Sequence, residues 1–143
     1  MTLIIDAAPL VAAADRRDPQ APAVVSFLRD ETGELVIPAP VTAEVDYLLG
    51  RRLGRPARLA FLDDLAAGRF RVACLEVDDH GVVANLERRY ADLDVGLADL
   101  SLVVVAARFG TRRLLTFDER HFRALRPVDG GRFTLLPADE PAL

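Results

Sequence analysis

The hydrophobic residues of this chain fall into short apolar runs that alternate with longer segments of mixed polarity. The short runs are rich in Val, Ile and Leu, as in strands that are buried on both faces of a sheet. We expect strands over residues 3–5, 35–37, 70–75, 114–117 and 133–136. The segments between them favour helices over residues 7–15, 18–33, 41–53, 56–68, 78–90, 98–109 and 119–125.

Helix-start signals place two of these helices more closely. Asp18 followed by Pro19 is typical of an N-cap and first helical residue, and Asp78 with Asp79 predicts a second capped start. The helix over 98–109 is apolar nearly all round, so most of its surface must be covered.

Strands that alternate with helices indicate βαβ units with right-handed crossovers. The predicted fold class is therefore α/β, a three-layer α/β/α sandwich around a central, mainly parallel sheet of about five strands. We expect one domain over residues 1–136 and a flexible acidic tail over residues 137–143.

Composition narrows the class of protein. The chain has 143 residues, 51% of them hydrophobic and 28% charged, which suits one globular domain. A single cysteine, Cys74, excludes an internal disulfide, and two histidines with one cysteine cannot build a Cys₂His₂ or Cys₄ zinc site. The start of the chain lacks a cationic export signal, and the apolar run over 102–107 is too short to span a bilayer. We therefore expect a cytoplasmic protein without membrane contact.

The charged residues exclude further functions. All 18 basic residues are arginine, so mechanisms that need a lysine, such as the P-loop and the phosphorelay receiver, are excluded. The formal net charge of -4 does not suit a general nucleic-acid coat, although clustered arginines could hold a nucleic acid locally.

Four acidic side chains are expected at one edge of the sheet. Asp6 and Asp118 follow strands, Asp99 lies at the start of the apolar helix, and Glu44 lies in the first turns of the helix after the second strand. Ligands of open parallel sheets bind outside the carboxyl ends of the strands. Taken singly, Asp6, Asp99 and Asp118 are each better explained as N-caps. Glu44 lies too far into its helix to cap it, so its alternative is a solvated helix face.

If the four carboxylates converge, they need a cation. Two carboxylates about 4 Å apart repel by roughly 4 kcal/mol at an effective dielectric constant of 20. An oxygen-only ligand set selects a hard ion, Mg²⁺ or Mn²⁺, and Mg²⁺ favours phosphate partners. A metal-activated water would then hydrolyse a phosphodiester. Dehalogenase-type phosphatases do not fit, because Ala8 stands where they need a second aspartate, and no dinucleotide-binding glycine motif follows a strand.

The ordered set of three segments gives the chain a family resemblance. VTAEVDYLL (41–49), GLAD (96–99) and LTFDERHF (115–122) stand in the order and spacing of PIN-domain ribonucleases, and the chain resembles the VapC-type toxins of bacterial toxin–antitoxin pairs over nearly its whole length. The resemblance implies Mg²⁺- or Mn²⁺-dependent RNA cleavage, homodimerisation and inhibition by a VapB-type antitoxin.

The resemblance also implies roles for individual residues. Asp6, Glu44, Asp99 and Asp118 match the four metal-holding acids, and Thr116 matches an accessory hydroxyl beside the site. The chain departs from the family after its first aspartate, where Ala7, Ala8 and Pro9 replace a frequent Ser or Thr.

Arginines near the site are candidates for RNA contact. One group lies around a helix junction and the other near the fourth strand: Arg51, Arg52, Arg55 and Arg58, then Arg112, Arg113, Arg120, Arg123 and Arg126. We predict that Arg120 or Arg123 contacts an RNA phosphate. His121 is a candidate general acid, but a structural role in its turn is favoured. Asp46 should point away from Glu44, and Asp94 is either an extra rim acid or a loop charge.

Two alternative functions stay open at this point. The chain could be a non-catalytic PIN-fold binding module, which metal-dependent turnover of RNA would exclude. It could also be a housekeeping RNA-processing nuclease without an antitoxin, which the neighbouring reading frame would reveal.

Overall fold

The computed structural model describes residues 1–141 and contains a five-stranded parallel sheet. The strands lie in the order β3-β2-β1-β4-β5, and every neighbouring pair is parallel. They are β1 (Leu3–Ile5), β2 (Leu35–Pro38), β3 (Arg71–Ala73), β4 (Arg113–Leu115) and β5 (Thr134–Leu136). The predicted parallel α/β class is confirmed.

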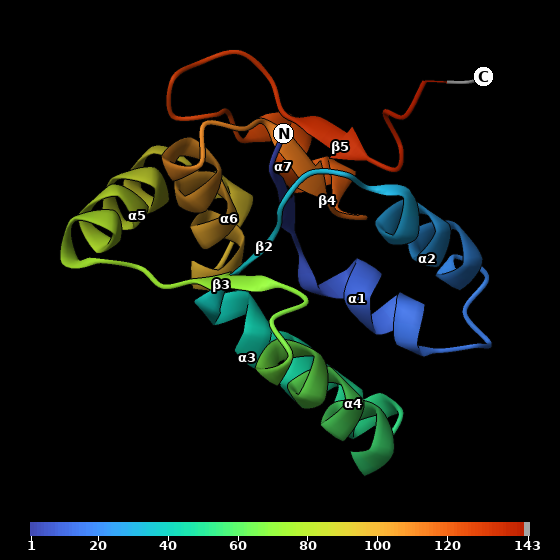
Figure 1. The fold of residues 1–143 in the computed structure, drawn as a ribbon. Coiled ribbons are helices and arrows are strands. Elements are labelled where there is room, and N and C mark those ends of the chain that lie inside the picture. The colour runs from blue at the N-terminus through green and yellow to red at the C-terminus, as the bar shows by residue number, and fades with distance from the viewer. Residues whose placement is uncertain (142–143) are drawn as a thin grey trace.

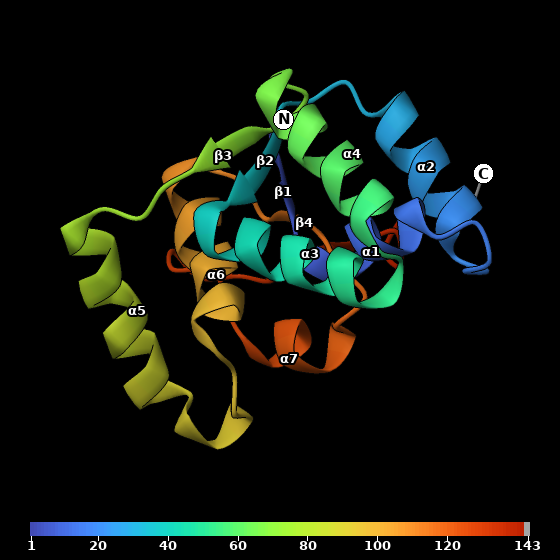
Figure 2. The same ribbon diagram turned by 90° about the horizontal axis from the view of Figure 1, so that it is seen from below.

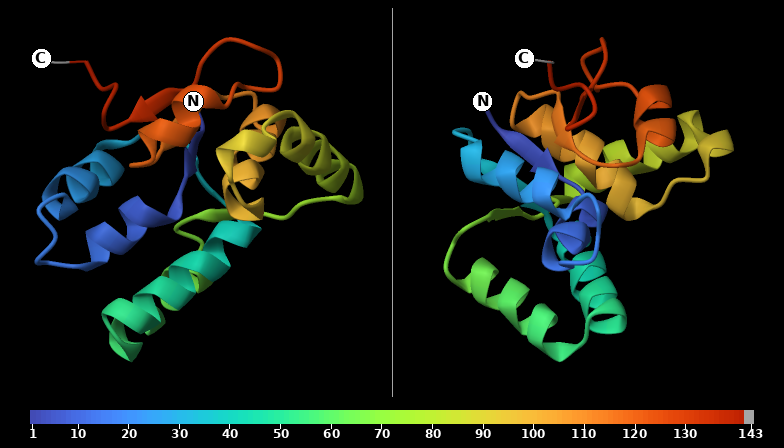
Figure 3. Two further views of the ribbon diagram at one scale, coloured as in Figure 1. Left: turned by 180° about the vertical axis from the view of Figure 1, so that it is seen from behind. Right: turned by 90° about the vertical axis from the view of Figure 1, so that its right-hand side faces the viewer.

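Helices cover both faces of this sheet. They are α1 (Ala7–Ala14), α2 (Ala21–Asp30), α3 (Ala39–Arg52), α4 (Arg55–Ala66), α5 (Val77–Arg89), α6 (Leu97–Arg108) and α7 (Glu119–Ala124), with a 3₁₀ turn, η1 (Ala91–Leu93). Helices α1 to α4 lie on one side of the sheet and α5 to α7 on the other (Figures 1 and 3). The chain reverses direction across the sheet between β3 and β4, and right-handed crossovers then place the later helices on the opposite face.

The core is formed by the strands and by α6. Leu3, Ile4 and Ile5 of β1 are fully buried, as expected for a central strand covered on both faces. Helix α6 packs against β1, β2 and β4 and also against α3 and α5. Its residues from Leu100 to Ala106 are all buried, which confirms that this apolar helix is covered on most sides.

Two predicted helix starts are wrong. Helix α2 begins at Ala21, because Asp18 forms a turn in which its carboxylate accepts a hydrogen bond from the Gln20 N–H at 2.8 Å. Helix α5 begins at Val77 after Glu76. Asp79 stands three residues beyond that cap and accepts the Glu76 N–H at 2.8 Å in a capping box.

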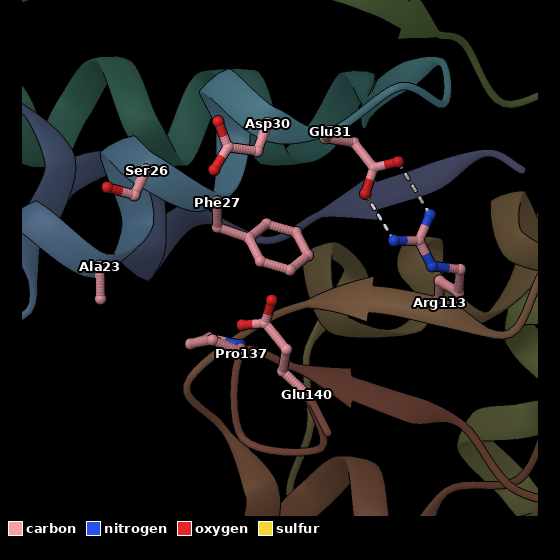
Figure 4. A pocket seen from close by; sticks show the side chains of 8 residues that line it. All are labelled: Ala23, Ser26, Phe27, Asp30, Glu31, Arg113, Pro137 and Glu140. Atoms are coloured by element: carbon pink, nitrogen blue, oxygen red, sulfur yellow. Dashed lines mark hydrogen bonds and ion pairs between the residues drawn. The ribbon is translucent and has the colours of Figure 1, made fainter. Parts of the chain in front are cut away.

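At the amino ends of the strands, an ion pair joins β4 to the segment after α2. Arg113 donates to both carboxylate oxygens of Glu31, whose side chain is only 7% exposed, and also to the Met1 carbonyl. The hydrogen bonds from Arg113 hold the pKa of Glu31 below its usual value. Beside the pair lies a cavity of about 390 Å³, lined also by Phe27 and Glu140 (Figure 4).

The segment after β5 is attached to the domain through Asp139. Its carboxylate accepts hydrogen bonds from Arg123 at 2.8 and 2.6 Å and from the Leu135 N–H at 2.7 Å. Residues 142 and 143 of the predicted tail lie outside the described residues.

Among residues 1–141, no helix has the length and apolar character that crossing a bilayer requires.

Candidate active site

The parallel sheet places the predicted acids at its carboxyl edge. Asp6 directly follows β1, Glu44 lies in α3 just after β2, Asp99 lies in the first turn of α6, and Asp118 precedes α7. Seen from below, helices α1, α3, α6 and α7 surround this edge (Figure 2). The site is therefore assembled from segments more than a hundred residues apart.

Asp6 is the buried centre of the site. Its side chain is 7% exposed, and it accepts hydrogen bonds from the Ala7 N–H and from the Thr116 hydroxyl, both at 2.8 Å. The pKa of Asp6 is raised to about 6, mainly by burial and to a smaller extent by the nearby Asp99 and Glu44 carboxylates, against the lowering effect of the two hydrogen bonds. The Ala7 contact is the N-cap of α1, so Asp6 caps the helix and also belongs to the acidic site.

Glu44 and Asp99 belong to the same electrostatic group. Partial desolvation of its carboxyl group raises the pKa of Glu44, although the residue is largely exposed, and the Asp99 carboxylate raises it further. Asp99 is not the N-cap of α6, because Gly96 holds that position and donates its N–H to Asp99 at 3.3 Å. Three acids therefore act on one another across α1, α3 and α6.

Asp118 is linked to this group through Thr116. The buried Thr116 hydroxyl donates to Asp6 and accepts the Asp118 N–H at 3.0 Å. The Asp118 carboxylate caps α7 by accepting the His121 N–H at 3.0 Å, and its other oxygen lies 2.7 Å from the His121 Nδ1. This last hydrogen bond raises the pKa of His121.

The donor set suits a hard cation. Within residues 1–141, no three His, Cys, Asp or Glu side chains already stand in an arrangement that would coordinate a metal. The same residues provide no ion-pair partner for Asp6, Glu44 or Asp99. Three coupled carboxylates without a neutralising arginine are oxygen ligands of the kind that Mg²⁺ and Mn²⁺ prefer.

The structure separates the candidate arginines. Arg123 is held by Glu119 at 2.9 Å and by Asp139 at 2.6 Å, so its guanidinium is already neutralised. Arg120 is exposed, and no carboxylate among residues 1–141 pairs with it. Asp46 points away from Glu44, as predicted, and pairs with Arg58 at 2.7 Å. Asp94 lies exposed in the loop before α6 with a left-handed backbone, φ 54°.

Sequence reasoning missed two features of the site. The contact between His121 and Asp118 follows from their i, i+3 spacing across one helical turn, which was the available signal. Tyr47 lies three residues after Glu44 in α3 and is 63% exposed, an unusual setting for a large aromatic residue beside an acidic site.

Comparison with known proteins decides the family. The family model of the PIN domain matches residues 3–126. The chain belongs to the PIN-domain family. This PIN-domain protein is also 41% identical to ribonuclease VapC26 of Mycobacterium tuberculosis over 135 residues, which cover 94% of this chain and all of that relative. The prediction of a PIN-domain ribonuclease of the VapC type is confirmed, and such nucleases generally depend on a divalent metal ion.

Two solved structures share the PIN fold of this chain. VapC20 of Mycobacterium tuberculosis, described as a toxin that cleaves the sarcin–ricin loop, superposes with a TM-score of 0.76 at 18% identity, over 82% of this chain and 91% of VapC20. VapBC2 of Rickettsia felis, bound to a DNA fragment of its promoter, gives a TM-score of 0.66 at 16% identity, over 87% of this chain and 93% of the matched chain. At these identities the match concerns the fold.

Proposed function

We propose that this PIN-domain protein is the toxin of a VapBC-type pair and hydrolyses RNA phosphodiester bonds at the carboxyl edge of its sheet. The observation that carries the proposal is the grouping of Asp6, Glu44 and Asp99: the Asp99 carboxylate raises the pKa of both Asp6 and Glu44, and none of the three has a cationic partner among the described residues. Such a group is costly to the apo fold and becomes favourable when a divalent cation neutralises it. The 41% identity to a VapC ribonuclease supports RNA as the substrate.

The metal would be held by Asp6, Glu44 and Asp99, with Asp118 as the fourth carboxylate. When bound, Mg²⁺ or Mn²⁺ supplies a water of lowered pKa and neutralises charge on the leaving oxygen. Thr116 fixes the orientation of Asp6, because its hydroxyl binds one Asp6 oxygen while the Ala7 N–H binds the other. His121 restrains Asp118 in the same way.

Partners follow from the same assignment. A VapB-type antitoxin would silence the enzyme, and the active form would be a homodimer that works in the cytoplasm. Arg120 remains a candidate for RNA phosphate, since its guanidinium has no carboxylate partner within residues 1–141. Arg123 would need to leave Glu119 and Asp139 to serve the same purpose, so we rank it second.

The first test replaces Asp99 by asparagine, which keeps the size of the side chain and removes its charge. We expect Asp99→Asn to lower RNA cleavage by more than about 100-fold and to abolish growth arrest. The measurement is mapping of RNA 5′ ends after controlled expression, which also identifies the RNA. Asp63→Asn, an exposed acid of α4, is the matched control and should cleave like the parent chain. Full cleavage by Asp99→Asn in EDTA would exclude the proposed mechanism.

A further inference from the structure

Tyr47 stands on the helix face that leads away from the acidic site. It lies in α3 at i+3 from Glu44, and Arg51 lies at i+7, so the three residues share one side of the helix. At about 1.5 Å per residue, Tyr47 is one turn and Arg51 two turns from Glu44 along the axis. The Tyr47 side chain is 63% exposed, and no residue within 1–141 hydrogen-bonds its hydroxyl.

The ring borders an open cavity that holds unneutralised positive charge. This cavity has a volume of about 590 Å³ and is lined by Asp46, Tyr47, Gly50, Arg51 and Arg58. Arg58 is paired with Asp46 at 2.7 Å, whereas no carboxylate among residues 1–141 pairs with Arg51. Gly50 leaves room for the Arg58 side chain beside α3, because an added Cβ would stand 3.3 Å from the Arg58 Cδ.

We propose that Tyr47 stacks on an unpaired base next to the phosphate that is cleaved, and that Arg51 binds a phosphate farther along the same RNA strand. The inference rests on the proposed ribonuclease function and adds an RNA-binding track to it. Exposed aromatic rings bind unstacked bases, and a neighbouring guanidinium binds the backbone. One helical turn, about 5.4 Å, is the order of distance that separates neighbouring nucleotides from one another.

Charge favours RNA as the occupant of this face. The protein has a formal net charge of -4, yet the end of α3 and the start of α4 carry exposed arginines, namely Arg51, Arg52 and Arg55. The acids of the site repel an RNA strand, so the strand needs cationic contacts beside them. Arg51 lies on the same helix face as Glu44 and provides such a contact.

The test measures RNA binding in the Asp99→Asn background, which prevents cleavage. The probes are a fluorescent single-stranded RNA of mixed sequence, about 12 nucleotides long, and its duplex with the complementary strand. We expect Tyr47→Ala to weaken single-strand binding by roughly 5- to 100-fold and duplex binding much less. Tyr47→Phe keeps the ring and should bind within about 2-fold of the parent, since stacking needs only the π-face.

Arg51→Gln should act differently from the tyrosine variants. It removes one phosphate contact, so it weakens single-strand and duplex binding alike and lowers the slope of log K against log salt by about 0.7 to 0.9. Arg132→Gln is the control for charge, because Arg132 is exposed and lies before β5, at the opposite end of the strands from the acids.

The outcomes separate this inference from the function on which it rests. If the parent chain cleaves RNA but Tyr47→Ala binds and cleaves like the parent, the inference is wrong and the proposed function stands. If the parent neither binds nor cleaves RNA, both are wrong. If Tyr47→Ala leaves RNA affinity unchanged but alters the elution volume or antitoxin binding, the face belongs to a protein partner and the RNA assignment is overturned.

Discussion

At the scale of single residues, the environment of Asp6 both binds its carboxylate and disfavours its charge. Its carboxylate is almost fully buried, caps α1 and receives the Thr116 hydroxyl, and yet its pKa is raised to about 6. The two hydrogen bonds do not offset the loss of hydration and the charges of Asp99 and Glu44. Without a cation, the ionised form of Asp6 therefore destabilises the folded state relative to the neutral form.

This conflict predicts a pH dependence of stability. The pKa of Asp6 is raised from 3.8 in the unfolded chain to about 6 in the folded one. The contribution of Asp6 to the free energy of unfolding is therefore fully present at low pH, below about 4, and about 3 kcal/mol of it is lost as the pH rises through 6. Asn at position 6 stays neutral, so the unfolding free energy of the parent minus that of Asp6→Asn should fall by most of this amount between about pH 4 and 7. Urea denaturation in EDTA measures it. A difference that stays constant with pH would contradict the raised pKa.

The sequence predicted which acids lie near one another better than it predicted what each one contacts. Asp6, Glu44 and Asp99 could be placed at one edge because parallel strands end together. The pairing of Arg123 with Asp139 could not be predicted, since Asp139 lies sixteen residues away beyond β5. Asp99 was open to interpretation as an N-cap, and only the structure shows Gly96 in that position.

At the scale of elements, Asp79 joins α5 to α6. One of its oxygens accepts the Glu76 N–H at 2.8 Å and the Arg108 guanidinium at 2.7 Å. Asp79→Ala removes both the capping box and the ion pair, and we expect a loss of about 1–2 kcal/mol in the free energy of unfolding. Asp78→Ala is the matched control, because this exposed neighbour has the same charge in the same turn and should cost at most about 0.5 kcal/mol. Urea denaturation compares the two, and equal losses would contradict the capping role.

Hydrophobic periodicity predicted the elements but not their ends. All five strands were expected, yet residues 70–75 shorten to Arg71–Ala73, and residues 114–117 shift to Arg113–Leu115. The reason is physical, since strand ends depend on the hydrogen bonds of neighbouring strands rather than on local apolar content. Asp18 shows that helix ends are equally hard to predict, because an aspartate before a proline can stabilise a turn as well as act as an N-cap.

At the scale of the whole molecule, the change of direction between β3 and β4 creates the site. It sends α6 to the face opposite α3, so that Asp99 and Glu44 approach Asp6 from two sides of β1. At the amino edge of the sheet, the Glu31 carboxylate is paired with the Arg113 guanidinium. Asp6, Glu44 and Asp99, which have no ion-pair partner among residues 1–141, lie at the other end of the strands, where we propose that a cation neutralises them.

A cation that binds this edge should stabilise the whole fold. Because it binds the assembled acids and not the unfolded chain, Mg²⁺ at 100 times its Kd adds about 2.7 kcal/mol to the free energy of unfolding. Thermal unfolding should then show a Tm several degrees higher with MgCl₂ than with NaCl at the same ionic strength, which controls for screening. Asp63→Asn should keep this rise, whereas Asp6→Asn and Asp99→Asn should lose most of it because each lacks one carboxylate. An equal rise in Asp99→Asn would place the cation elsewhere, and no rise in the parent would remove the metal from the mechanism, both without any measurement of cleavage.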